Sequence, residues 1–318
     1  MKKLFKKALI AAALAMPVLS YAAATPIMFD SNGAAAGGQL TIDTLDWAPG
    51  NALAVNGNPT TGLLLPGTQT QLLYQANLGL ASLNGVTVYA PPLSGFNFTA
   101  VAGFNEVVIS NTTGLNPTFG LASAPVRSAT NFFYIYANAF GDNLTGLGFV
   151  GSTLALSGYV ASVNSSNFTG SGTVANPTIA PLDNFGANNY PGISTLVGSG
   201  TTDLVLVVDG ISAFFPTLTP GTTLSFFNTS TLTPFSTANP SALFSSNGTV
   251  GANTASNTGA INGVRLPGDT AQHNFQFLAD GSSSFQQVQK VPEPGSLALV
   301  GLALGIAGFM RRRTAKKA

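Results

Sequence analysis

Residues 131–137 read Asn-Phe-Phe-Tyr-Ile-Tyr-Ala, one of several short apolar runs in the middle of the chain. Two further runs are DLVLVV at 203–208 and TTLSFF at 222–227. They are rich in Val, Ile, Thr, Phe and Tyr, the residues that β-strands favour, and turn residues separate them. Between the two ends of the chain, no apolar repeat of about 3.6 residues continues for about 12 positions. The sequence therefore predicts an all-β protein whose body resembles a β-sandwich or a jelly roll.

The rest of the central region follows the same pattern. Other predicted strands lie at 86–89, 106–109 and 153–163. Asn-Gly at 84–85 and Asp-Gly at 280–281 have the chemistry of tight hairpin turns. Residues 70–81 fit a helix or a strand equally well, and the polar stretch 228–262 predicts a long exposed loop. One large β-domain and two smaller ones both fit a region of this length.

Charge is distributed unevenly along the chain. The sequence holds 12 Lys and Arg residues and 11 Asp and Glu residues, and nine of the basic residues lie at the two ends. Between the ends, three basic residues stand against all 11 acidic ones, a net charge of −8. Such a region lacks the cationic surface that a phosphate backbone requires, so we exclude nucleic acid as a partner.

Composition also excludes several kinds of reactive site. The chain has no Cys, which excludes disulfides, thiolate nucleophiles and Cys-ligated metals. His273 is the one histidine, so the common multi-histidine metal sites are excluded as well. Charged residues make up 7% of the chain, against about 25% in an average globular domain. Hydroxyl and amide groups must therefore supply most of the polar chemistry.

The N-terminal segment 1–24 has the three parts of a secretory signal peptide. Four Lys residues between positions 2 and 7 precede an apolar stretch at 8–19. Three alanines at 22–24 supply the small residues that cleavage requires, so we expect the mature chain to begin at Thr25. The sequence thus predicts export through the Sec pathway.

The C-terminal segment 291–318 also has three parts. It contains the tetrapeptide Val291, Pro292, Glu293 and Pro294, an unbroken apolar and Gly run at 297–310, and then Arg311, Arg312 and Arg313. As a helix the run would be about 21 Å long, shorter than a hydrocarbon core of about 30 Å. The arginines predict a cytoplasmic stop-transfer signal, and the run predicts a transient anchor in the inner membrane.

This order and spacing resembles the PEP-CTERM sorting signal. The resemblance implies a Gram-negative bacterium that makes exopolysaccharide, and processing near the Pro-Glu-Pro motif by an exosortase, a membrane enzyme similar to a transpeptidase. It also implies release to, or display on, the cell surface or the extracellular matrix. The predicted segments are then a signal peptide at 1–24, a β-rich extracellular body at 25–280, a tether at 281–290 and the sorting signal at 291–318.

Parts of the body carry a second resemblance. Residues 29–33 (FDSNG), 45–54 (LDWAPGNALA), 73–76 (LYQA) and 274–285 (NFQFLADGSSSF) are similar to segments of the flocculation-associated PEP-CTERM proteins. The similarity covers the two ends of the body and little of its middle. It implies a surface protein that helps floc-forming bacteria to retain exopolysaccharide, and it brings no catalytic residue.

The body contains candidates for two kinds of binding site. Trp47, in the segment 45–51, has the chemistry to stack on a sugar ring, although a single Trp is more often a core residue. Asp30 with Asn32, and separately Asp142, offer oxygens to a Ca²⁺ ion, without the full spacing or the distal Glu of a calcium loop. Asx-turns explain the same residues without an ion. Calcium is the one cofactor that the sequence raises.

Catalysis has little support in the sequence. No G-x-S-x-G motif surrounds a serine that His273 would activate. A glycosidase needs paired carboxylates, but the two Glu residues are Glu106 and Glu293, and the second lies in the sorting signal. We therefore expect a structural or adhesive protein of an exopolysaccharide matrix without enzymatic activity. A carbohydrate-binding module and a polysaccharide-modifying hydrolase are the alternatives.

Overall fold

The computed structural model describes residues 24–33, 37–61, 64–91, 97–245, 253–254 and 273–286. All of them belong to the first of the two units into which the chain divides, 1–286 and 287–318. The described part consists of strands and their connections, with one short 3-10 helix at Pro59–Thr61 (η1). The predicted all-β class is therefore confirmed.

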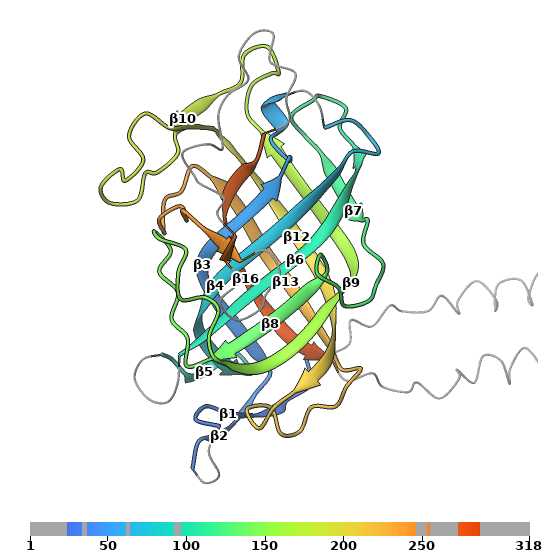
Figure 1. Cartoon of the computed structure of the whole chain (residues 1–318), viewed down its shortest axis with the longest axis vertical. Helices are drawn as coiled ribbons and strands as arrows, with labels where there is room; N and C mark the ends of the chain where they lie inside the picture. Colours follow the sequence, from blue (N-terminus) through green and yellow to red (C-terminus); the bar gives the residue numbers. More distant parts are fainter. Residues whose placement is uncertain are drawn as a thin grey trace, which may run out of the picture. The chain divides into compact units, whose positions relative to one another are not determined.

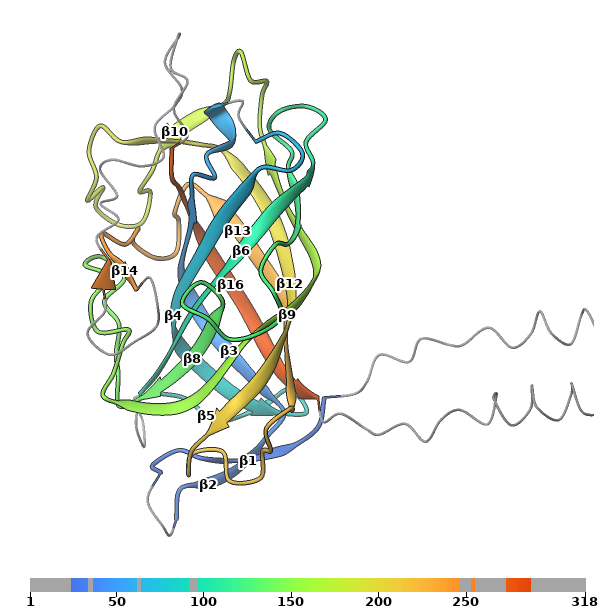
Figure 2. The same ribbon diagram turned by 45° about the vertical axis from the view of Figure 1, so that its right-hand side comes forward.

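Eight strands make up the frame of the body. They are β3 (Thr44–Val55), β4 (Gln69–Leu83), β6 (Phe98–Ser110), β8 (Phe132–Ala137), β9 (Thr153–Gly170), β12 (Gly198–Ile211), β13 (Thr223–Thr233) and β16 (Phe275–Gln286). The other strands are β1 (Ile27–Asp30), β2 (Gln39–Ile42), β5 (Val86–Tyr89), β7 (Thr118–Leu121), β10 (Ile179–Pro181), β11 (Ser194–Leu196), β14 (Phe244–Ser245) and β15 (Asn253–Thr254). Most of these are short and lie at the ends or on the outside of the frame (Figures 1 and 2).

The frame strands form one antiparallel sheet that closes on itself. Each is hydrogen-bonded to the next frame strand along the chain, from β3 and β4 through to β13 and β16. The last strand then pairs with the first, with Phe275 opposite Ala54 and Ser284 opposite Thr44. Figures 1 and 2 show these strands winding around a common interior. We call this frame the closed sheet.

Two short strands complete the closed sheet. β8 spans six residues and pairs with the first half of β6, and β7 pairs with the second half, at Glu106–Ser110. β7 thereby occupies the interval between β6 and β9 that β8 leaves open. β5 forms a hairpin with β4, and Asn84 and Gly85 at its turn have φ angles of +51° and +77°. The hairpin predicted at 84–85 is confirmed.

The structure corrects one predicted turn and two predicted boundaries, and it resolves an open question. The Asp-Gly pair at 280–281 is not a hairpin turn, because it lies inside β16 at a register shift against β3. Residues 281–286 are the second half of the same strand, so the predicted tether cannot begin at 281. Residues 70–81 lie within β4 and are strand rather than helix. In the predicted loop 228–262, residues up to Thr233 belong to β13.

Aromatic side chains from four strands meet in the interior of the closed sheet. Trp47 of β3 stacks on Phe226 of β13 with ring centroids 6.4 Å apart and planes 7° from parallel. Phe133 of β8 and Tyr74 of β4 approach the same Phe226 ring edge-on, at 5.5 and 6.2 Å. Strands from all sides of the sheet thus meet through one ring, which gives the core its continuity.

A second aromatic cluster fills one end of the interior. Phe29 of β1 lies 5.1 to 5.5 Å from the rings of Tyr89, Phe98 and Phe215. Both views show the β1–β2 hairpin just beyond this end of the long strands (Figures 1 and 2). The hairpin therefore acts as a plug, held by aromatic contacts that bury large areas.

On the outside of the closed sheet, a buried amide network fastens loop segments to the strands. Asn51 of β3 donates to the Asn143 side chain at 3.3 Å and to the Asn239 carbonyl at 3.1 Å. Its Oδ1 accepts hydrogen bonds from the Ser241 backbone at 2.9 Å and from Gln276 of β16 at 2.8 Å. Asn51 and Gln276 are fully buried, so these bonds replace water that the amides have lost. We call this set the amide network.

Neighbouring side chains repeat the same device. Asn77 of β4 donates to the Gly141 carbonyl and accepts from the Gly141 N–H, both at 2.8 Å. Gln75 donates to the Ser241 hydroxyl and to the Leu243 carbonyl, both at 3.0 Å. Hydrogen bonds from neutral amides thus hold the loops to the strands, a role that disulfides and ion pairs have in many other proteins. This chain has no Cys and few charged residues.

Candidate functional site

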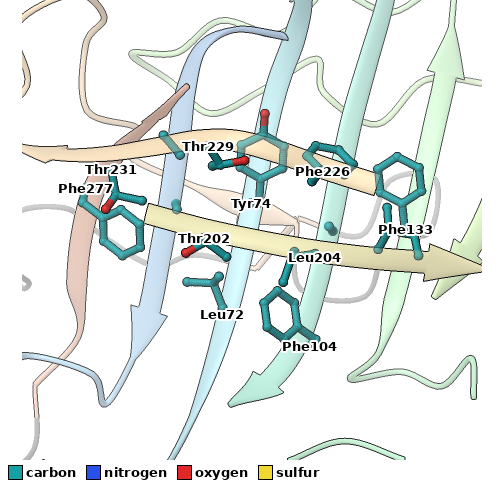
Figure 3. A pocket seen from close by; sticks show the side chains of 14 residues that line it. Leu72, Tyr74, Phe104, Phe133, Thr202, Leu204, Phe226, Thr229, Thr231 and Phe277 are labelled. Atoms are coloured by element: carbon teal, nitrogen blue, oxygen red, sulfur yellow. The ribbon is translucent and has the colours of Figure 1, made fainter. Parts of the chain in front are cut away.

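Two small cavities adjoin inside the closed sheet. The first has a volume of about 40 Å³ and an almost wholly apolar lining, and the second has a volume of about 30 Å³ and a more polar lining. Leu72, Thr202, Thr231 and Phe277 line both cavities, so the two are direct neighbours. Figure 3 shows the first cavity, with side chains from opposite walls of the sheet turned toward the same space.

The first cavity owes its space to small side chains on three strands. Ala52 of β3, Ala102 of β6 and Ala279 of β16 line it. Phe226 and Phe133 bound it on another side, as Figure 3 shows. A methyl group at each of three sites leaves room that neighbouring aromatic rings are too rigid to fill.

A belt of polar side chains crosses the interior at the second cavity. Glu106 of β6 accepts a hydrogen bond from Ser166 Oγ of β9 at 3.1 Å, and that Oγ lies 3.2 Å from Thr202 Oγ1 of β12. Thr202 stands opposite Thr229 of β13 in the strand register. Thr229 and Thr231 carry buried hydroxyls without a hydrogen-bond partner among the described residues. We call these five residues the polar belt.

Glu106 is the titratable group of the polar belt. It is 3% exposed, and burial raises the pKa of its carboxyl to about 7, although the hydrogen bond from Ser166 lowers it. At neutral pH the group therefore exists both as a hydrogen-bond donor and as a carboxylate acceptor. Sequence reasoning missed this role. The available signal was the strand at 106–109, in which side-chain alternation places Glu106 on the same face as Val108.

Trp47 does not lie where the predicted sugar contact requires. It is 1% exposed, its ring stacks on Phe226, and its Nε1 donates a hydrogen bond to Ser283 Oγ at 3.1 Å. A sugar ring outside the closed sheet cannot reach the indole face. The residue therefore belongs to the core, and the prediction of a carbohydrate contact at Trp47 is wrong.

The first calcium candidate forms a turn that packs against the core. Asp30 Oδ1 accepts hydrogen bonds from the backbone N–H groups of Asn32 and Gly33, at 3.2 and 3.0 Å. Gly33 has a φ of +57°, and a Cβ there would lie 2.5 Å from the ring of Phe214. Asp30 therefore serves here as the acceptor of an Asx-turn, the alternative that requires no ion.

The second calcium candidate has the same local role. Asp142, in the loop after β8, accepts from the Leu144 N–H at 2.9 Å and from the Thr145 hydroxyl at 2.8 Å. Both carboxylate oxygens are thus engaged within three residues of their own position. Within the described ranges, no three His, Cys, Asp or Glu side chains gather as a metal site would require.

The predicted sorting residues lie outside the described part of the chain. This holds for Val291, Pro292, Glu293 and Pro294, for the apolar run at 297–310, and for Arg311, Arg312 and Arg313. Nearly all of the predicted signal peptide lies outside it as well. Among the residues that are described, no helix is long and apolar enough to cross a membrane.

Comparison with known proteins identifies the C-terminal segment. Residues 290–313 match the family model of the PEP-CTERM protein-sorting motif, and the match includes the Pro-Glu-Pro element, the apolar run and the three arginines. No curated protein and no solved structure matches the chain. The resemblance to flocculation-associated proteins therefore stays a prediction. The motif marks a chain that is exported and processed by an exosortase, and this protein is a PEP-CTERM domain-containing protein.

Proposed function

We propose that this protein is a structural or adhesive component of the bacterial cell surface or extracellular matrix. In this role it supports floc or biofilm formation in association with exopolysaccharide. The observation that carries the proposal is the sorting motif at 290–313, which directs the chain to the exosortase. The proposal thus rests on where the protein is sent rather than on any single side chain of its body.

The chemistry of the body supports a scaffold role. Its charged residues are few, and the polar groups are mainly hydroxyls and amides, which are suited to hydrogen bonds with sugar hydroxyls. The closed sheet and the amide network hold those groups on a rigid frame. Each contact of this kind is weak, but many copies of the protein on one cell surface bind a polysaccharide chain at many points and so hold it firmly.

Three of the described carboxylates have a structural use. Asp183 resembles Asp30 and Asp142, because it accepts hydrogen bonds from the N–H groups of Phe185 and Asn189 at 3.0 and 2.9 Å. These side chains stabilise loops, which is a structural use. A hydrolase would instead need two carboxylates that face a common substrate.

The export claim is tested by locating the mature protein in wild-type and exosortase-deficient cells, with mass spectrometry of both termini. We expect the surface protein to begin at Thr25 and to lack Arg311 to Arg313. In exosortase-deficient cells we expect it to stay in the membrane fraction with those arginines intact. Surface protein that keeps the arginines in wild-type cells would contradict the processing step.

The matrix role needs a separate test. We expect deletion of the gene to weaken floc or biofilm cohesion, and we expect a wild-type copy to restore it. The matched control is a copy with Arg311, Arg312 and Arg313 replaced by Ala, which keeps the body and removes the stop-transfer signal. Unchanged cohesion in the deletion strain would refute the matrix role and leave the export claim standing.

A carbohydrate-binding function is the second candidate, and one surface feature favours it. Tyr134, on the outer face of β8, is partly exposed and stacks on Phe132 with ring centroids 5.7 Å apart. Opposite it in the register lies Ser157 of β9, whose hydroxyl donates to Asp209 at 2.8 Å and accepts from Arg127 at 3.1 Å. Ser157 itself is buried and holds the Arg127–Asp209 ion pair, whose Nε and Oδ2 atoms lie 3.1 Å apart. An aromatic face beside this partly exposed ion pair suits a sugar ring, which offers C–H groups on its faces and hydroxyls at its edge.

This candidate is tested by polysaccharide pull-down with exopolysaccharide from the producing strain. We expect Tyr134→Ala to reduce the bound fraction and the core variant Trp47→Phe to retain it. Equal retention by wild type and Tyr134→Ala would remove the outer face of β8 from consideration.

A further inference from the structure

The two interior cavities together form a site with an apolar end and a polar end. The first is lined mainly by alanine, leucine and phenylalanine side chains, whereas the second adds Glu106, Ser166 and Asn167 to a lining that is otherwise mostly apolar. Thr202 and Thr231 lie on the boundary, because they line both. Such a polarity gradient inside a core matches a molecule that is itself apolar at one end and polar at the other.

An unused hydroxyl marks the point where such a molecule would be held. Thr231 is 5% exposed, and its Oγ1 has no hydrogen-bond partner among the described residues, although it lines both cavities. Figure 3 shows the hydroxyls of Thr202, Thr229 and Thr231 among the apolar side chains of the first cavity. Buried polar groups are nearly always paired, because an unpaired one costs free energy. A valine would fill the same volume without that cost, so the hydroxyl at position 231 calls for a function.

The volumes limit the size of the ligand. The cavities measure about 40 and about 30 Å³, and one water-sized atom needs roughly 10 to 15 Å³ on this measure. The combined site therefore has room for about five non-hydrogen atoms. A sugar ring, a fatty acid or a nucleotide is too large.

We propose that the interior of the closed sheet is a binding site for a small neutral alcohol, a hydroxyl group on an apolar chain of about four carbons. The chain would occupy the first cavity among Ala52, Ala102 and Ala279. The hydroxyl would donate to Glu106 and accept from Thr231, both of which line the second cavity. An anion is excluded because the Glu106 carboxylate repels it, and a cation would lose its hydration in a lining that is mostly apolar.

The polar end is also the natural entrance. At the opposite end the aromatic cluster around Phe29 fills the interior. The second cavity, in contrast, is bounded partly by residues outside the strands, which include Gly57, Pro59 and Pro117. Connecting segments open at lower free-energy cost than paired strands, so a ligand enters past them and passes the polar belt first.

The test uses the exported protein and four probes of equal chain length: 1-butanol, butane, butanoate and butylamine. At pH 8, methyl and amide NMR spectra follow each titration. We expect 1-butanol to shift the signals of cavity-lining residues in a saturable way, with an affinity on the order of millimolar. We expect butane to bind several-fold more weakly, and butanoate and butylamine to leave those signals in place.

Variants then separate the ligand site from a packing gap. Thr231→Val removes the unused hydroxyl at constant volume, and we expect it to keep or raise stability while weakening 1-butanol binding about five-fold. Ala102→Leu fills the first cavity and should abolish binding; if it fails to fold, Ala279→Val serves the same purpose. Thr87→Val is the matched control, because Thr87 is exposed on β5 and the substitution should change nothing.

Three results would overturn the proposal. The first is the absence of saturable shifts in the lining residues with 1-butanol. The second is butanoate or butylamine binding as well as 1-butanol. The third is full 1-butanol affinity in Thr231→Val, which would reduce the site to an apolar gap. None of these results bears on export or on the matrix role.

Discussion

Glu106→Gln is expected to abolish a loss of stability that the wild-type protein undergoes between mildly acidic and neutral pH. The carboxyl has an ordinary pKa of 4.5 and a pKa of about 7 in the folded protein, because burial disfavours its charged form. The folded state therefore holds the proton more tightly than the unfolded state. The stabilising contribution is complete below about pH 4.5 and is lost as pH rises to about 7.

The size of the effect follows from the two pKa values. At ~1.4 kcal/mol for each pH unit, the interval from 4.5 to about 7 corresponds to about 3 kcal/mol of unfolding free energy. Glutamine keeps the acceptor for Ser166 and has no proton to lose in this range. The wild-type protein should thus lose about 3 kcal/mol relative to Glu106→Gln between pH 4.5 and pH 8.

The assay is urea unfolding at half-unit steps from pH 4.5 to pH 8.5, followed by the fluorescence of Trp47. Trp47 is buried and is the one tryptophan of the chain, so its emission reports loss of the core. Asp142→Asn is the matched control, because Asp142 is exposed and should show the wild-type pH profile. A wild-type profile that runs parallel to that of Glu106→Gln would refute the reasoning about Glu106.

Three more perturbations test the fold. Trp47→Ala removes a central ring and should cost about 3 to 5 kcal/mol in urea unfolding, followed by circular dichroism because the variant lacks tryptophan. In the wild-type protein, acrylamide should quench the emission of buried Trp47 weakly. Asn51→Ala breaks four hydrogen bonds and should lower the unfolding free energy by about 2 to 4 kcal/mol, and it should speed proteolysis of the 138–150 loop. Asn77→Ala breaks two hydrogen bonds and should lower the unfolding free energy by less. Gly33→Ala should lower the thermal midpoint through strain and contact with Phe214, whereas EDTA should leave the wild-type midpoint unchanged. Wild-type urea midpoints for Trp47→Ala and Asn51→Ala would contradict the assigned packing. A lower thermal midpoint in EDTA would support a bound calcium ion.

Several of the strands could be predicted from the sequence, because apolar runs and turn residues report local structure. The run at 131–137 became β8 within one residue of its predicted start, and the turn at 84–85 was placed correctly. Closure of the sheet could not be predicted from the sequence. It depends on the pairing of β16 with β3, which joins segments more than 200 residues apart, and on register shifts such as the one between Trp47 and Asn51.

The candidate residues show the same division between local and distant information. The turns at Asp30 and Asp142 use partners within a few residues, so an Asx-turn was a correct alternative from the sequence alone. Trp47 was ambiguous, because its burial depends on Phe226, which lies far along the chain. The polar belt was invisible, since Glu106, Ser166 and Thr231 come from three strands that only the closed sheet brings together.

Closure of the sheet also affects how copies of the protein behave toward one another. In the proposed surface role, many copies of the chain would lie side by side, and open strand edges under such crowding act as templates for fibril growth. Each frame strand here is bonded on both sides, and among the described strands of the main sheet β5 is a four-residue edge with one partner. In the matrix role proposed above, densely packed copies would therefore stay separate molecules, because they offer few open strand edges from which fibrils could grow.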